Sequence, residues 1–183
     1  QCESFQFVVS GQVKLFVASA NGVEKVIELI GPGHSFAEAM MFLPKPYMLN
    51  AQTLTDTLIM TVSKQAVFSE IERDPRFSMH MLSGISHWLH RLLLDVEGYT
   101  LHSGMQRLIG YLLRDVELEH EGDFGIVTVS FPVSKATIAS RLSLTPEYFS
   151  RVLHQLESEG LIEIDRREIR ILDVRRLASY GSH

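Results

Sequence analysis

Short alternations of apolar and polar residues fill the first third of the chain, and turn residues separate them. The apolar stretches are Phe5 to Val9, Val13 to Val17, Val26 to Ile30 and Leu58 to Val62. Strands of this length predict hairpins, one turning at Ser10-Gly11 and another at Asn21-Gly22. Together they predict a small antiparallel barrel or sandwich, and we expect the natural barrel to begin before Gln1.

A helical period of three to four residues replaces this alternation in the middle of the chain. Ser63 can cap a short helix over 64–71. Asp74-Pro75 then supplies a cap and a proline at the start of a much longer helix, from about Arg76 to about Leu101. A further amphipathic helix follows over 106–119.

The apolar residues of the long helix form a seam that favours dimerisation through a coiled coil. The predicted dimer interface comprises Met81, Ile85, Trp88, Leu92, Val96 and Tyr99. The alternative is that this helix packs on its own barrel. Because Leu89 and Leu93 widen the apolar face, the pattern is compatible with both arrangements.

The last third of the chain has the pattern helix, tight turn, helix, hairpin. The first helix covers 134–142, Ser143-Leu144 leaves room only for a turn, and Thr145-Pro146 opens a second helix that stops at Gly160. Two strands joined by a basic turn follow over 161–172. The inward face of the second helix comprises Phe149, Val152, Leu153 and Leu156. This order predicts a winged helix-turn-helix with its second helix in the DNA major groove; the simpler alternative is a helical hairpin.

The polar face of the second helix carries side chains that can read bases. Arg151 can donate two parallel hydrogen bonds to guanine, Glu147 can accept one from cytosine or adenine, and Ser150 can contact a base or a phosphate. In the alternative, Glu147 is a favourable charge at a helix N-terminus and Arg151 is a solvated one. The predicted phosphate contacts are Lys135, Thr145, Arg166 and Arg167, and Arg141 belongs to the same basic cluster.

The amino-acid composition and net charge limit the class of protein to which this chain can belong. The 183 residues are 45% hydrophobic and 21% charged, enough for one or two domains, and the net charge is −5. Acidic residues outnumber basic ones over 1–129, whereas basic residues slightly outnumber acidic ones over 130–183, where phosphates would lie. We see no membrane-spanning run and no signal peptide, and the lone Cys2 excludes a disulfide framework within these residues. We therefore expect a cytoplasmic protein without a membrane partner.

A small barrel, a long helix and a winged helix-turn-helix resemble the CRP/FNR superfamily of bacterial transcription regulators. Residues 35–42 resemble the barrel segment of its DNR branch, and 146–151 and 168–173 resemble the same branch at the other end. The resemblance implies a homodimer that binds double-stranded DNA and acts with RNA polymerase. It also implies control of denitrification or other anaerobic genes through an inverted repeat of the TTGAT…ATCAA type. Pro146 departs from the CRP-like members, which carry an arginine there.

The resemblance divides the chain into three parts: an effector-sensing barrel over 1–75, a dimerisation helix over 76–101 and a DNA-binding domain over 102–180. In such regulators an effector in the barrel repositions the DNA-binding domains, and Gly98 and Gly104 are candidate hinge points.

Two effectors of the superfamily do not suit this sequence. Relatives that bind cyclic AMP hold it with an arginine–serine pair and a threonine–serine pair, and those places fall here on Tyr47-Met48 and Leu92-Leu93. Only Glu38 matches, and a buried phosphate without a cation would be costly. An iron–sulfur cluster needs four thiolates, which the residues shown do not supply.

An apolar pocket remains, and the DNR resemblance implies haem in it with nitric oxide as effector. The predicted pocket comprises Phe36, Glu38, Met40, Met41, Leu89, Leu92 and Leu93, with His34 and His90 as candidate haem ligands. These positions could equally be barrel core. The alternative within the same class is a regulator that senses a different small apolar or redox effector without haem.

Two other functional classes fit the sequence less well. An enzyme is not expected, because the sequence shows no nucleophile–base pair, no glycine-rich phosphate loop and no metal-binding cluster. A constitutive architectural DNA-binding protein would bind DNA without an effector, and the sensor-like first half disfavours it.

Overall fold

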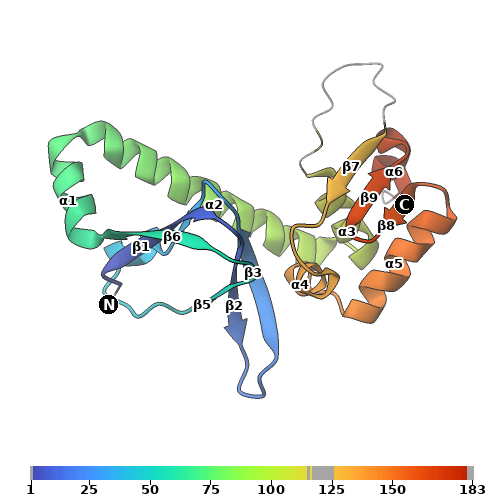
Figure 1. Ribbon diagram of the computed structural model, residues 1–183, viewed down its shortest axis with the longest axis horizontal. Helices are drawn as coiled ribbons and strands as arrows, with labels where there is room; N and C mark the ends of the chain where they lie inside the picture. The colour runs from blue at the N-terminus through green and yellow to red at the C-terminus, as the bar shows by residue number, and fades with distance from the viewer. Residues whose placement is uncertain (1, 115, 117–125, 181–183) are drawn as a thin grey trace. The chain divides into compact units, whose positions relative to one another are not determined.

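The computed structural model describes residues 2–114, 116 and 126–180 (Figure 1). The chain divides into two compact units, residues 1–95 and residues 96–183, and each is treated by itself. No helix among the described residues is both long enough and apolar enough to cross a membrane.

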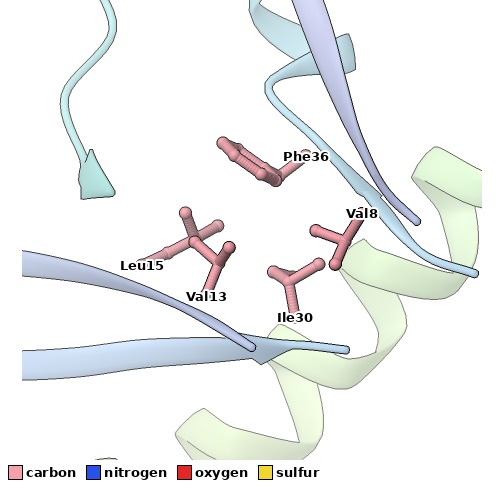
Figure 2. Packing of buried hydrophobic residues seen from close by; sticks show 5 residues of the cluster. All are labelled: Val8, Val13, Leu15, Ile30 and Phe36. Atoms are coloured by element: carbon pink, nitrogen blue, oxygen red, sulfur yellow. The ribbon is translucent and has the colours of Figure 1, made fainter. Parts of the chain in front are cut away.

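The first unit contains two antiparallel sheets of three strands each. One has the order β4 (Ser35–Phe36), β1 (Ser4–Ser10), β6 (Leu58–Ser63), and the other β3 (Glu24–Ile30), β2 (Val13–Ala18), β5 (Asn50–Thr53). A 3₁₀ helix, η1 (Glu38–Phe42), follows β4. Figure 2 shows the core of this unit, where side chains from β1 to β4 converge. Its fully or nearly buried members are Val8, Val13, Leu15, Ile30 and Phe36.

The predicted barrel is corrected in one respect. Hydrogen bonds join strands only within each three-stranded sheet of the described residues, so the sheets do not close into a barrel. The shared side-chain core holds them together instead. The α+β class, with a small β domain, helices and a C-terminal helix-turn-helix, is confirmed.

The first predicted hairpin is wrong, because β1 pairs with β4 and β6 whereas β2 pairs with β3 and β5. Gly11 carries the chain from one sheet to the other with a φ of 89°, and a Cβ there would collide with Thr57. The second predicted hairpin is confirmed, since β2 and β3 pair around Asn21-Gly22.

Two helices follow the sheets. The Ser63 hydroxyl accepts a hydrogen bond from the Ala66 amide at 3.2 Å and caps α1 (Lys64–Arg73). The Asp74 carboxylate accepts one from the Arg76 amide at 3.0 Å at the start of α2 (Pro75–Leu101). Hydrogen bonds from the Arg76 side chain and amide lower the pKa of Asp74. The two predicted caps therefore start the helices as expected.

The second unit contains the winged helix-turn-helix. After α3 (Gly104–Leu113) come α4 (Lys135–Arg141), α5 (Pro146–Ser158) and α6 (Val174–Tyr180), with a sheet in the order β7 (Val127–Ser130), β9 (Glu168–Ile171), β8 (Ile162–Asp165) (Figure 1). The predicted inward face of α5 is buried, and Phe149 and Leu156 have no exposed surface. The predicted extension of α3 over 117–119 lies outside the described residues.

Candidate functional site

Interactions between residues close in sequence fix where α5 begins in the second unit. The Thr145 hydroxyl accepts a hydrogen bond from the Tyr148 amide at 3.2 Å, and Pro146 occupies the first helical position. Since one face of α5 is buried, Glu147, Ser150 and Arg151 project from the opposite side and are exposed. The structure therefore brings the three candidate base-reading side chains onto one accessible helix face.

The aromatic ring of Tyr148 supports this face. The Arg151 guanidinium carbon lies 4.8 Å from the centre of that ring, within cation–π distance. A groove of about 440 Å³ begins beside the pair at the N-terminus of α5. Its lining comprises Gly104, Arg107, Ser143, Leu144, Thr145, Glu147, Tyr148 and Arg151. Tyr148 and Arg107 were not predicted from the sequence; the available signal for Arg107 was an arginine on the mostly apolar α3.

The candidate phosphate-binding residues lie at three places in the second unit. Arg166 and Arg167 are exposed at the tip of the β8–β9 hairpin, where Arg166 has a φ of 54°. Lys135 is half-buried at the start of α4, and Thr145 is exposed at the cap of α5. The exposed hairpin tip is thus the most accessible cationic feature of the four candidates.

Arg141 does not belong to the phosphate-facing cluster. Only 7% of its surface is exposed, and its Nη1 donates a hydrogen bond to the Tyr99 hydroxyl at 2.9 Å. That hydroxyl in turn donates to the Arg141 carbonyl at 2.6 Å. The structure therefore corrects the expectation for Arg141, which anchors the end of α4. The Tyr99 hydroxyl is engaged within its own unit, and the place of Tyr99 at a dimer interface stays a prediction.

We expect Tyr99→Phe to destabilise the protein by about 1–3 kcal/mol, because the change removes both hydrogen bonds from a buried guanidinium and its carbonyl. Urea unfolding measures the loss. Tyr180→Phe is the matched control, since the Tyr180 hydroxyl accepts a long, 3.4 Å hydrogen bond from Gln155. Equal stability of Tyr99→Phe and the wild type would contradict the anchoring role.

Gly104 lies where the start of α3 approaches Tyr148 and Leu144 closely, so its surroundings are not those of a free hinge. It begins α3, and a Cβ there would lie 2.5 Å from Tyr148 Cε1 and 2.8 Å from Leu144 Cδ2. The missing side chain lets the Tyr148 ring, on which Arg151 rests, pack against the start of α3.

We expect Gly104→Ala to cost about 1–3 kcal/mol of stability and to weaken DNA binding, because the added methyl group displaces Tyr148. Gly110→Ala in the same helix is the control, since nothing lies within 4 Å of a Cβ there. That control should stabilise the protein by about 0.5–1 kcal/mol. Thermal unfolding and DNA titrations of both variants check the prediction, and identical behaviour would overturn it.

The first unit contains a cavity of about 250 Å³. Four of the seven predicted pocket residues line it: Phe36, Glu38, Met40 and Leu92. The other three do not. Met41 is buried in the core with 1% of its surface exposed, whereas Leu89 and Leu93 are 55% and 60% exposed. Its further lining comprises Leu15, Ile27, Ile30, Ser35, Ala37, Ala39, Tyr47, Met48, Leu49, Ile85 and Trp88.

The long helix α2 therefore has two apolar stripes, and one of them packs on its own unit, which is the alternative that the sequence left open. Ile85, Trp88 and Leu92 face the cavity of their own unit. A second stripe is exposed; within the first unit it comprises Met79, Leu82, Leu89 and Leu93. Its three- and four-residue steps, with Ser86 between Leu82 and Leu89, are those of a coiled-coil seam, and the sequence continues them at the exposed Val96. Met81 is half-buried.

Glu38 supplies the carboxylate of the cavity. Its Oε1 accepts a hydrogen bond from the Ser35 hydroxyl at 3.2 Å, while its Oε2 is buried and has no hydrogen-bond partner in the described part of the chain. Burial, followed by the Glu38 charge, raises the pKa of Tyr47 to about 12, so this phenol stays protonated. The lining contains no lysine, arginine or histidine.

The candidate haem ligands lie elsewhere in the first unit. His34 and His90 are both exposed, and neither lines the cavity. His34 Nδ1 lies 3.1 Å from the Pro32 carbonyl oxygen.

Comparisons with known proteins match both units. The model of the Crp-like helix-turn-helix domain matches residues 106–180, and that of the cyclic nucleotide-binding domain matches residues 1–74. A CRP-like cAMP-activated global transcriptional regulator of Mycobacterium tuberculosis is 23% identical over 171 residues, covering 93% of this chain and 76% of the relative. The cyclic AMP receptor protein of Thermus thermophilus is 24% identical over 162 residues, 88% of this chain and 72% of the relative. The solved structure of FixK2 from Bradyrhizobium japonicum superposes with a TM-score of 0.81 at 20% identity, covering 97% of this chain and 86% of that one.

Proposed function

The chain belongs to the CRP/FNR superfamily of effector-gated transcription regulators, and from this premise we propose that it binds an inverted-repeat DNA site as a homodimer. In the proposal, residues 1–75 sense the effector, 76–101 dimerise and 102–180 bind DNA. The observation that carries it is the exposed face of α5, where Arg151 rests on Tyr148 beside Glu147 and Ser150.

The resemblance to the family gives each half-site the TTGAT type, and the side chains of this face have the chemistry to read it. Arg151 donates to guanine, Glu147 accepts from cytosine or adenine, and Ser150 supports either contact, as in a TTGAT-type half-site. Arg166, Arg167, Lys135 and Thr145 contact phosphates and set the register of α5 in the groove. The bound dimer then acts with RNA polymerase at the promoter.

Dimerisation uses the exposed stripe of α2 formed by Met79, Leu82, Leu89 and Leu93. A two-stranded coiled coil would bury these side chains, which are all more than half exposed in the single chain. The side of α2 that lines the cavity, with Ile85, Trp88 and Leu92, is already partly buried by its own unit. A seam beside the effector cavity gives an effector a direct route to the dimer geometry.

The cavity does not fit the haem that the DNR resemblance implies. Haem iron takes histidine, cysteine or tyrosinate, or methionine beside histidine, as axial ligands. The lining offers no histidine or cysteine, and its one tyrosine, Tyr47, has a pKa raised to about 12 that keeps it protonated. It also offers no cation for the two propionates of haem.

We therefore place the alternative effector class first: a small apolar molecule bound without haem. Nitric oxide sensing and control of denitrification genes rest on the resemblance of 35–42, 146–151 and 168–173 to the DNR branch, and no contact in the cavity adds support for them.

The test is a titration of the purified protein into fluorescent duplexes that carry the TTGAT…ATCAA repeat or the same bases in scrambled order. We expect tighter binding to the repeat, with a stoichiometry of two chains per duplex. In vitro transcription with RNA polymerase from a promoter carrying the repeat tests regulation. Equal affinity for both duplexes would refute sequence-specific regulation and favour an architectural DNA-binding protein.

A further inference from the structure

The chemistry of the cavity in the first unit specifies what kind of effector it accepts. The lining is almost entirely aliphatic, thioether and aromatic, so most of the ligand surface must be apolar. Its polar side chains are Ser35, Glu38 and Tyr47, together with the indole of Trp88. The specificity of the cavity therefore depends on a few groups around Glu38.

Glu38 Oε2 can accept a hydrogen bond from a bound ligand. It is buried and unpartnered among the described residues, while Oε1 is held by Ser35. A buried carboxylate oxygen without a hydrogen bond is costly, and a ligand that donates to it recovers that cost on binding. The preceding residue, Ala37, has a φ of 75°, a left-handed conformation that is unfavourable for alanine and that fixes where Glu38 begins η1.

The side chains that line the cavity disfavour a negatively charged ligand. No cationic side chain lines the cavity, and the Glu38 carboxylate would repel an anion placed beside it. Arg91, the nearest cation in sequence to Trp88 and Leu92, instead lies 3.7 Å from the buried Glu28 carboxylate and does not line the cavity. A phosphate or carboxylate would therefore be buried without a counter-ion.

We propose that the cavity binds a compact, mostly apolar effector that carries a hydrogen-bond donor and no negative charge, with the donor placed on Glu38 Oε2. The donor is a hydroxyl or an amine. This inference rests on the proposed function, because it assigns a ligand class to the effector site of that regulator.

Trp88 reports directly on occupancy, because it lines the cavity and is the single tryptophan of the chain. Four probes share one ring and differ in one group: cyclohexylmethanol, cyclohexylmethylamine, methylcyclohexane and cyclohexanecarboxylate. We expect the alcohol or the amine to shift Trp88 emission saturably and to bind about tenfold or more tightly than the hydrocarbon and the carboxylate. The relative affinity of the alcohol and the amine shows whether the cavity prefers a neutral or a cationic donor. Cyclic AMP serves as an anionic reference and is expected to leave the emission unchanged.

Two variants test the assigned contact. Glu38→Leu should abolish the preference for the alcohol or amine over the hydrocarbon, and Glu38→Gln, which keeps the shape and an acceptor, should reduce it. Tyr47→Phe is the matched control that removes a hydroxyl from the same cavity and leaves the carboxylate; it should keep the preference. If Glu38→Leu does not fold, the four-probe series on the wild type still tests which class of ligand the cavity binds.

Tighter binding of the carboxylate or of cyclic AMP would overturn the proposal, and so would equal binding of the alcohol, amine and hydrocarbon or no saturable shift with any probe. The DNA titration is run on the same preparation. Specific DNA binding with failed probe binding would reject only the ligand class, whereas failed DNA binding would reject the proposed function.

Discussion

Replacing Arg151 by alanine is expected to lower the affinity for the TTGAT-type repeat by about 1–3 kcal/mol at each half-site. The guanidinium lies on the exposed face of α5 and is stacked 4.8 Å from the Tyr148 ring, which restricts its motion before DNA arrives. A side chain held in this way loses less conformational entropy on binding than a free arginine. The variant should also discriminate poorly at the guanine position, because alanine donates no hydrogen bond.

The measurement compares fluorescence anisotropy titrations on the repeat and on a repeat with that guanine replaced. Arg166→Ala is the control: as a phosphate contact at the hairpin tip, it should weaken both duplexes alike and lower the slope of log affinity against log salt by about one. If Arg151→Ala weakens both duplexes equally, Arg151 contacts phosphate and the assignment of the base reader is refuted.

Replacing Leu89 and Leu93 together by aspartate is expected to convert the dimer to monomers and to abolish tight binding to the full inverted repeat. Both side chains are more than half exposed in the single chain, and each gains about 1.5–3 kcal/mol when fully buried. The twofold axis of a dimer doubles this contribution, and four buried carboxylates on one seam would repel each other. Because neither residue lines the cavity, the fold of the first unit should be retained.

Sedimentation equilibrium measures the mass, and circular dichroism verifies that the helix content is unchanged. His87→Asp is the control, since His87 is exposed on α2 but lies off the stripe of Met79, Leu82, Leu89 and Leu93. That variant should remain dimeric. A dimer that survives the double substitution at wild-type affinity would show that the subunits pair through another surface.

The helix boundaries at the start of α1, α2 and α5 could be predicted from the sequence because caps act over three or four residues. Ser63, Asp74 and Thr145 each accept a hydrogen bond from a backbone amide two or three positions later. The buried face of α5 followed from the same short range, since its apolar spacing fixes which side meets the core. The exposed positions of Glu147, Ser150 and Arg151 were thereby determined without tertiary information.

The tertiary structure decided what each apolar stripe of α2 faces. That helix is apolar on more than one side, so its periodicity is consistent with several rotations about its axis, and the sequence seam through Ile85, Trp88 and Leu92 turned out to line the cavity. The pairing of Arg141 with Tyr99, 42 residues apart, and the separation of β1 from β2 at Gly11 had no local signal either. The unpartnered oxygen of Glu38 emerged only once Ser35, Tyr47 and Trp88 had been brought around one cavity. Local hydrogen bonds fix the elements of this protein, whereas the choice among equally apolar faces depends on contacts between residues distant in the chain.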